Sequence, residues 1–228
     1  MKFCPFDVHK ITTDLLTGRK EFVFPDGRKA IQGTDVSEFV GEVDWPLVKS
    51  DGMEFVFVRI AKRDLVTGVL FEDKRWRENV AGAYEAGMKV GAYFVTSALN
   101  EEERREEAAY VKDLLEGQPI TWPLALDVEV PNEKWRTYNQ DPKILTDLTL
   151  IFTKELESYN PILYCNSIPE LQKKFELERL DHIQKWIAEY RFKPYYPYDF
   201  SIWQYSYTAK IKGINSPGDY DLSFIDFG

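Results

Sequence analysis

Cysteine and histidine are scarce in this chain, and long apolar runs are absent. Cys4 and Cys165 are the only cysteines and lie far apart in the sequence, which excludes a disulfide framework or a four-cysteine metal site. The only histidines, His9 and His182, do not have the spacing of zinc ligands. No apolar run reaches the length of about 18 residues that a membrane-spanning helix needs. The sequence therefore predicts a soluble protein without disulfides, zinc or a membrane span.

The first residues and the net charge argue against an export signal and against further kinds of binding partner. The opening segment MKFCPFDVHK has Asp7 where a signal peptide needs an unbroken apolar core. We therefore expect no export signal in this chain, which would travel by another route or lack its leader. The formal net charge is −9, and no Lys or Arg cluster is dense enough to bind a run of phosphates. We expect neither nucleic acid nor a membrane as a partner, and we expect a monomer.

From residue 31 onward, short apolar segments alternate with longer amphipathic ones, which is typical of parallel βα units in one α/β domain. With 228 residues, 44% hydrophobic and 29% charged, the chain can bury a full core. The predicted strands are Ile31–Val36, Glu54–Ala61, Lys89–Val95, Pro123–Glu129, Pro161–Cys165, Lys185–Glu189, Phe200–Tyr205 and Asp219–Leu222. Eight strands suggest a closed, TIM-like barrel over residues 31–228.

Helical periodicity recurs between these strands. One helix is marked by Trp76, Val80, Ala83 and Tyr84, with Gly87 as its stop. A second begins at a capping box made by Asn100 and Glu103 and turns Ala108, Val111 and Leu115 inward. A third is marked by Leu145, Leu148, Phe152, Leu156 and Tyr159.

The first thirty residues differ from the rest. Two strand-like runs flank Pro25-Asp26-Gly27, and an Asp-Gly pair in this context is a strong hairpin signal. The segment has six Lys and Arg against four Asp and Glu, so it is positive, while the remaining residues are strongly negative. We interpret residues 1–30 as an appended β-hairpin. The aromatic, proline-containing loop 191–199 is a second irregular segment that could contact a substrate.

The segment WPLALDVEV, residues 122–130, carries two carboxylates at the end of an apolar run. On a strand, Asp127 and Glu129 point to the same face, with Cα atoms about 6.7 Å apart. Two carboxylates at such a spacing can protonate a leaving oxygen and stabilise positive charge on a sugar ring, as glycoside hydrolysis requires. The alternative is that this Asp-x-Glu pair is surface charge or a helix cap.

Two further acids fall on the same rim of the predicted barrel. In parallel α/β barrels, working residues sit at the carboxyl ends of strands. Asp35 ends the first strand and Asp221 lies in the last, and closure makes those strands neighbours. Crowded carboxyls in a partly apolar cleft raise at least one pKa. We expect Glu129 to be the general acid, although Asp35 alone could equally serve a local turn.

Aromatic residues make up 15% of the chain, and rigid rings can stack on sugar faces. Tyr93, Tyr164, Trp186 and Trp203 lie in or at the ends of predicted strands. Their positions suit either the barrel interior or the cleft.

Seven segments together resemble the lysozymes of glycoside hydrolase family 25. They are DVSEFVGEVDW (35–45), GAYEAGMKVGAYF (82–94), PLALDVE (123–129), ILYCNS (162–167), WIAEY (186–190), WQYS (203–206) and DYDLS (219–223). Their order and spacing match across nearly all of residues 31–228. The resemblance implies an irregular α/β barrel and an N-acetylmuramidase that cuts the β-1,4 bond between N-acetylmuramic acid and N-acetylglucosamine in peptidoglycan. It implies no metal or cofactor, and it places the activity at the bacterial cell wall, as in an endolysin.

Carried over by position, the resemblance assigns the proton donor to Glu129. Asp127 would orient the acetamido group or stabilise the oxocarbenium ion, with Asp35 and Asp221 in support. It leaves open whether the reaction uses the substrate's own acetamido group or a covalent intermediate. The candidate substrate-binding residues are Tyr93, Tyr164, Trp186, Tyr190, Trp203 and Gln204.

The chain departs from the family pattern at three places. Glu38-Phe39-Val40 replaces a common Trp-Gln segment, the stretch 59–64 differs from the usual sequence after the second strand, and Ser223 replaces a common asparagine. These departures affect expected sugar contacts and subsite specificity.

Two other functions compete with hydrolysis of the glycan. The chain could be a wall-binding module that kept the fold without catalysis, because function depends on the site rather than on the fold. A cysteine peptidase using Cys165 and His182 is the second, although a cysteine on a buried strand more often acts as a small hydrophobic residue. The family 18 chitinase pattern is excluded because Ala125 and Trp122 stand where it needs aspartates.

Overall fold

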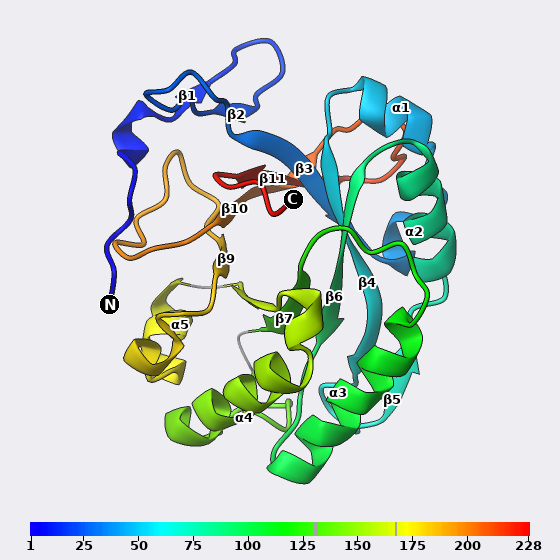
Figure 1. Ribbon diagram of the computed structural model, residues 1–228, viewed down its shortest axis with the longest axis vertical. Helices are drawn as coiled ribbons and strands as arrows, with labels where there is room; N and C mark the ends of the chain where they lie inside the picture. Colours follow the sequence, from blue (N-terminus) through cyan, green and yellow to red (C-terminus); the bar gives the residue numbers. More distant parts are fainter. Residues whose placement is uncertain (130–131, 167) are drawn as a thin grey trace.

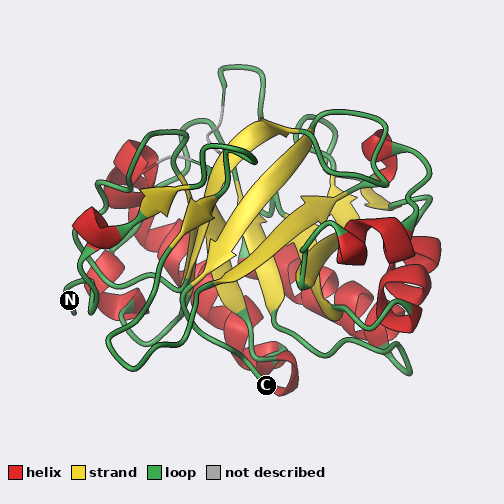
Figure 2. Ribbon diagram, turned by 90° about the horizontal axis from the view of Figure 1, so that it is seen from above, coloured by secondary structure: helices red, strands yellow, loops and turns green. Residues whose placement is uncertain are grey.

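The computed structural model describes residues 1–129, 132–166 and 168–228, and in this part of the chain eight strands close into a barrel (Figures 1 and 2). The strands follow one another around the barrel in the order β3 (Ile31–Val36), β11 (Gly218–Ser223), β10 (Ile202–Ala209), β9 (Lys185–Ala188), β8 (Ile162–Cys165), β7 (Leu124–Val128), β6 (Lys89–Val95) and β4 (Phe55–Arg63). A parallel β3–β4 pairing closes the ring, and β5 (Leu70–Glu72) pairs with β4 as an additional strand. The predicted α/β barrel is confirmed, with all eight predicted strands present and some ends shifted.

The last strand runs against the others, which corrects the expectation of a purely parallel barrel. β11 is antiparallel to both β10 and β3, whereas the other barrel pairs are parallel. The reason is the length of the connection, because residues 210–217 alone join β10 to β11 and a parallel crossover needs about a dozen residues or more. The start of β11 therefore lies beside the end of β3.

Helices surround much of the barrel (Figure 1). In the described ranges they are α1 (Trp45–Ser50), α2 (Trp76–Glu85), α3 (Glu101–Leu115), α4 (Pro142–Glu155) and α5 (Ile168–Lys174), with short 3-10 turns η1 (Val8–Lys10), η2 (Glu38–Val40), η3 (Glu157–Tyr159) and η4 (Leu177–Leu180). α2 and α4 lie where the periodicity places them, although the predicted third helix ends at Glu155 and continues as a 3-10 turn. None of the helices described is long and apolar enough to cross a bilayer.

The predicted cap of α3 is present with a small difference. The Asn100 side chain accepts a hydrogen bond from the Glu103 N–H, as an N-cap should. The Glu103 carboxylate reaches back one residue beyond the cap, to the N–H of Leu99 at 2.8 Å. The first bond satisfies one of the unpaired N–H groups at the helix start, and the second pairs the N–H of the residue before the cap. The predicted inward stripe of α3 is buried.

The first thirty residues form two consecutive turns, of which the second is the predicted one. β1 (Thr12–Thr13) pairs antiparallel with β2 (Lys20–Glu21). The predicted turn at Pro25-Asp26-Gly27 is present, because the Phe24 N–H donates to Arg28 O at 2.8 Å, but only one bridge, Val23 to Lys29, extends it. The strand that pairs with β2 is therefore β1, which precedes it in the chain, and not the residues that follow the Asp-Gly turn.

This N-terminal segment packs on the outer surface of β10, β11 and β3. The Phe6 ring stacks on Phe224 at 4.0 Å, and the Phe22 ring lies 5.5 Å from Phe224. The side chain of Gln32 on β3 donates to the backbone oxygen of Lys20. Because β10 and β11 are joined without a crossover helix, the segment covers apolar residues that a helix would otherwise cover.

Alternation along the strands divides the buried residues into two groups. One group fills the barrel and includes Phe55, Phe57, Trp122 and Trp186. Inside it, Phe57 stacks on Trp186 at 4.6 Å and Phe55 stacks on Trp122 at 4.5 Å. The larger group lies between the barrel and its surrounding elements. The stacked rings fill the barrel interior directly below its polar end.

Candidate active site

The structure brings the four predicted acids together at one end of the barrel interior. Asp35 lies near the end of β3, Asp127 near the end of β7, Glu129 directly after β7, and Asp221 within β11. The charge of Asp221 raises the pKa of Asp35, and the charges of Glu129 and Asp35 raise the pKa of Asp127. These carboxyls are therefore close enough to influence one another, although they come from three separate strands.

Asp127 and Glu129 differ in burial. Asp127 is 5% exposed, and its Oδ1 has no hydrogen-bond partner in the described part of the chain. Burial is the main reason that its pKa lies well above the ordinary value, and the charge of Glu129 adds to the effect. Glu129 is only half-buried, and burial raises its pKa as well. Both carboxyls therefore hold a proton more strongly than free side chains do.

Asp35 is held by an amide that two tyrosines share. Gln204 on β10 donates through Nε2 to Asp35 Oδ2 at 2.6 Å. Its Oε1 accepts hydrogen bonds from the hydroxyls of Tyr164 at 2.9 Å and Tyr190 at 2.7 Å. The amide can therefore not rotate without losing three hydrogen bonds, which fixes the position of the Asp35 carboxyl. Burial raises the pKa of Asp35 well above its ordinary value, while the bond from Gln204 opposes this.

Asp221 lies deeper than a parallel strand would place it, and Asp219 is a fifth acid that the sequence interpretation did not include. Asp221 is fully buried and accepts a hydrogen bond from Trp186 Nε1 at 2.9 Å. Asp221 pairs with Gly33, so Asp219 lies towards Asp35, further along the same face. Burial, and then the charge of Asp35, raise the pKa of Asp219 to about 9. In the sequence, the two-residue spacing between Asp219 and Asp221 indicates that both side chains point to the same face of a strand.

Lys62 on β4 lowers the pKa of Glu129, and Arg59 on the same strand acts on both acids of the central pair. It lies two residues beyond Phe57, and its charge lowers the pKa of both Asp127 and Glu129. The guanidinium is held by Asp73, with Nη2 2.8 Å and Nε 3.0 Å from Oδ2, and it lies 4.9 Å from the exposed ring of Phe39. The sequence signal was an arginine in alternation with Phe55 and Phe57 on the same strand.

Five of the six predicted substrate-binding residues lie in or beside this end of the barrel. Tyr93 and Tyr164 are buried in the barrel interior, and Tyr190 is half-exposed at its edge. Gln204 and Trp186 are buried and bonded to acids. Trp203 is different, because it is fully buried in the outer core and its Nε1 donates to Glu189 O at 2.8 Å. It faces away from the acids, on the opposite side of β10 from Gln204.

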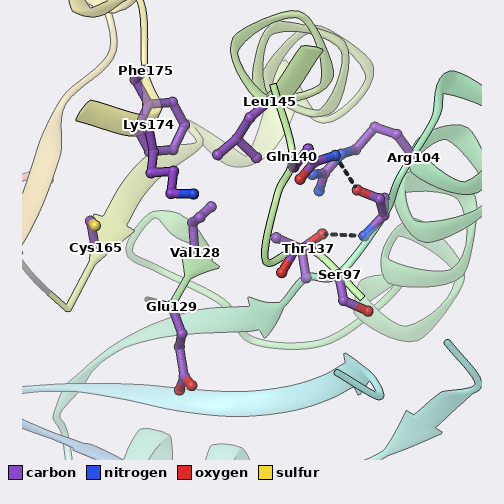
Figure 3. Close-up of a pocket in the computed structure, with 12 residues that line it drawn as sticks. Ser97, Arg104, Val128, Glu129, Thr137, Gln140, Leu145, Cys165, Lys174 and Phe175 are labelled. Atoms are coloured by element: carbon purple, nitrogen blue, oxygen red, sulfur yellow. Dashed lines mark hydrogen bonds between the residues drawn. The ribbon is translucent and has the colours of Figure 1, made fainter. Parts of the chain in front are cut away.

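The remaining candidate groups do not assemble into another site. Cys165 is buried in the outer core and lines a small cavity beside β7, and Figure 3 shows the Glu129 carboxylate pointing away from that cavity. His182 is exposed and lines a different depression with Leu150 and Asn160, so the two do not form a peptidase pair. In the described residues, no three His, Cys, Asp or Glu side chains are grouped to hold a metal ion.

Comparisons with known proteins agree with one another. The family described as Glycosyl hydrolases family 25 matches residues 34–214. The chain is 24% identical over 192 residues to an autolytic lysozyme of Clostridium acetobutylicum, a match that covers 84% of this chain and 55% of that protein. It is 36% identical over 69 residues to lysozyme M1 of Streptomyces globisporus, covering 30% of this chain and 22% of that protein.

Among solved structures, a family 25 glycosyl hydrolase from Bacillus anthracis has a similar fold. The TM-score is 0.73 at 22% identity, and the alignment covers 91% of this chain and 94% of that one. By contrast, the chain spans about half the length of the Clostridium lysozyme and less of the Streptomyces one.

Proposed function

This chain belongs to glycosyl hydrolase family 25, and from that premise we propose that it is an N-acetylmuramidase acting on bacterial peptidoglycan. It is a glycoside hydrolase of the lysozyme type. The bond that we assign to it is the β-1,4 bond between N-acetylmuramic acid and N-acetylglucosamine. Its place of action would be the bacterial cell wall, with the glycan strand as its partner.

The pairing of Glu129 with Asp127 is the observation that carries this proposal. A general acid must be protonated before the reaction and must reach the leaving oxygen. Glu129 suits both needs, because burial raises its pKa, so it keeps its proton to higher pH than a free glutamate, and its side chain is only partly buried. Asp127 is more deeply buried, and its Oδ1, which has no hydrogen-bond partner among the described residues, can accept the N–H of an acetamido group or face the developing positive charge.

Asp35 and Asp221 are proposed to shape the site without transferring the proton. Each is buried and bonded to a fixed donor, Gln204 for Asp35 and Trp186 for Asp221. We assign Asp219 the same role, because it lies on the same face of β11 as Asp221 and towards Asp35. Their role is to hold the polar end of the barrel in one arrangement, which a precise site needs.

Tyr93, Tyr164, Tyr190 and Gln204 are the residues that we propose to contact the sugar. They surround the acids, and Tyr190 is the most exposed of them. Trp186 lies under the acids and supports them through its bond to Asp221. We leave Trp203 out of the site because its ring belongs to the outer core.

The test is mass-spectrometric analysis of the reducing ends released from purified peptidoglycan. We expect new N-acetylmuramic acid ends with the wild type and a loss of about 10²- to 10⁴-fold in rate for Glu129→Gln, because a positioned general acid contributes that much. Glu133→Gln, an exposed position in the same loop, is the matched control and should retain activity.

Other products would lead to different conclusions. New N-acetylglucosamine ends or free peptide amines would mean that the assigned bond is wrong. Wall binding without any released reducing end would favour the wall-binding module, and near-normal lysis by Glu129→Gln would remove Glu129 as the acid.

A further inference from the structure

A groove beside the candidate site is built partly by the N-terminal segment. It has a volume of about 630 Å³ and is lined by Thr17, Gly18 and Lys20, by residues 190–192 after β9, by the end of β10 with Lys210 after it, and by Tyr220 on β11. This volume lies in the usual range for ligand sites. The family match begins at residue 34, so residues 17–20 lie outside the matched part of the chain. We call it the hairpin groove.

Tyr190 connects the hairpin groove to the acids. Its hydroxyl donates to Gln204 Oε1, the atom that Tyr164 also contacts, and Gln204 in turn holds Asp35. Its ring lines the groove and lies 4.7 Å from the ring of Tyr207. A ligand that leaves the acids over Tyr190 therefore enters the groove directly.

The charged residues of the groove are all basic. Lys20, Arg191 and Lys210 line it, and no Asp or Glu does so in the described part of the chain. This is unusual in a protein whose formal net charge is −9. Arg191 is paired only loosely with Glu189, at 3.6 Å, and its side chain is 66% exposed. An anionic group entering the groove would therefore meet no like charge on its walls.

Lys20 is the buried one of these three cations. Its side chain is buried, and its ammonium donates to Thr13 Oγ1 at 2.8 Å and lies 4.2 Å from the ring centre of Phe192. Within the described residues it forms no ion pair. Burial lowers the pKa of this ammonium, as expected for a cation without a carboxylate. A buried charge is ordinarily paired, so the missing partner is expected to come from a ligand.

We infer that the hairpin groove binds a carboxylate of the peptide stem that peptidoglycan carries on its muramic acid residues, with Lys20 as the buried counter-charge. This rests on the proposed function, because the glycan must lie over the acids for its stem to pass Tyr190. The groove then makes the enzyme prefer glycan that still carries its peptides. The exposed aromatic rings of Tyr190 and Phe192, both of which line the groove, give the stem an apolar surface.

Kinetics on two matched polymers test this preference. The polymers are uncrosslinked peptidoglycan and the same glycan after an amidase has removed its stems. Lys20→Met should lower kcat/KM on the stem-bearing polymer about 10-fold more than on the stripped one, mainly through KM, since a hydrogen bond to a charged group has about that worth. Lys20→Arg should retain most of the preference. Lys29→Met, exposed on the same segment, is the control.

A binding experiment separates failure of this inference from failure of the proposed function. N-acetylmuramoyl-L-alanyl-D-glutamate and its diamide are titrated by calorimetry into the Glu129→Gln protein. The acid should bind about 10-fold more tightly than the diamide, and Lys20→Met should remove the difference. Equal binding of the two compounds would overturn the inference, even if the wild type cleaves both polymers.

A second variant keeps the inference testable if the first one does not fold. If Lys20→Met lowers stability too far to be assayed, Arg191→Gln changes an exposed side chain and should still weaken the acid relative to the diamide. An unchanged ratio in that variant would count against the groove. Absence of cleavage of either polymer by the wild type would instead refute the proposed function, and the titration would still decide the groove.

Discussion

Aspartates of this chain lie in two opposite environments, and the environment decides their chemistry. Asp14 is in an exposed turn, where the backbone N–H groups of Thr17 and Leu16 lower its pKa. Asp219 lies at the mouth of the barrel, where burial and the charge of Asp35 raise its pKa to about 9. The first shift follows from a local turn motif, whereas the second needs strands that are far apart in the sequence.

Replacement of Asp219 by asparagine should stabilise the protein as pH rises. Below about pH 3.8 the carboxyl is protonated in both states, and above it the unfolded chain loses the proton while the folded chain keeps it up to about pH 9. The wild type therefore loses stability across this range, and Asp219→Asn removes the part of the loss that Asp219 causes, while the other acids with raised pKa values keep theirs. We expect the variant to gain at least about 1.4 kcal/mol at pH 8, the equivalent of one pKa unit. Urea unfolding of both proteins at pH 5 and pH 8 measures this. The prediction is contradicted if the difference in unfolding free energy between variant and wild type does not increase from pH 5 to pH 8.

At the scale of elements, the N-terminal segment and β11 depend on each other. A short connection makes β11 antiparallel, which leaves its outer face without a crossover helix. Phe6 and Phe22 cover that face by contact with Phe224, and Phe200 joins the same group of rings. Residues 1–30 are therefore bound to the barrel by their own apolar side chains, and we propose that they are part of its folding unit.

Truncation of Phe22 tests this dependence. The side chain is 3% exposed and touches the rings of Phe6, Phe24 and Phe224. Because Phe to Ala changes in cores cost about 3 to 5 kcal/mol, we expect Phe22→Ala to lower the free energy of unfolding by about 3 kcal/mol. Leu15→Ala, at a position 96% exposed in the same segment, should change it by less than about 0.5 kcal/mol. Equal effects of the two changes in a urea titration would show that the segment is not packed as described.

Over the whole molecule, the carboxyls of the barrel end titrate as one group. Asp35, Asp127, Glu129 and Asp221 all have raised pKa values. Arg59 opposes the rise at Asp127 and Glu129, and Lys62 adds to its effect at Glu129. Interacting acids lose their protons in shared steps, so the profile of activity against pH belongs to the cluster. The protein holds these acids in position through a ring of strands that closes only when the first and last strands meet.

Activity should fall on the alkaline side as the cluster loses its protons. Because burial raises the pKa of Glu129 above its ordinary value of 4.5, the loss of kcat/KM begins above that pH. Arg59→Gln removes the charge that lowers this pKa, so its alkaline limb should move to higher pH, by about one unit if the charge interaction is near 1.4 kcal/mol. Arg59→Lys keeps the charge and should leave the limb near its wild-type position. A limb that moves to lower pH in Arg59→Gln would reverse the assigned sign.

The sequence by itself determined the local elements and the central pair of acids. Strand alternation, the Gly87 stop and the Asn100 cap are properties of neighbouring residues, and they predicted β3, β6 and α2 almost to the residue. Asp127 and Glu129 were found because both stand on one short apolar segment, so their common face follows from the strand period alone.

Only the tertiary structure decided which distant residues join that pair. The direction of β11 places Asp219 beside Asp35, the facing of β10 sends Trp203 outward and Gln204 inward, and the inward face of β4 brings in Arg59. These outcomes depend on the pairing and facing of strands far apart in the sequence. Periodicity along one segment predicts that a strand has two different faces. Only the closure of the barrel decides which of these faces points towards the acids.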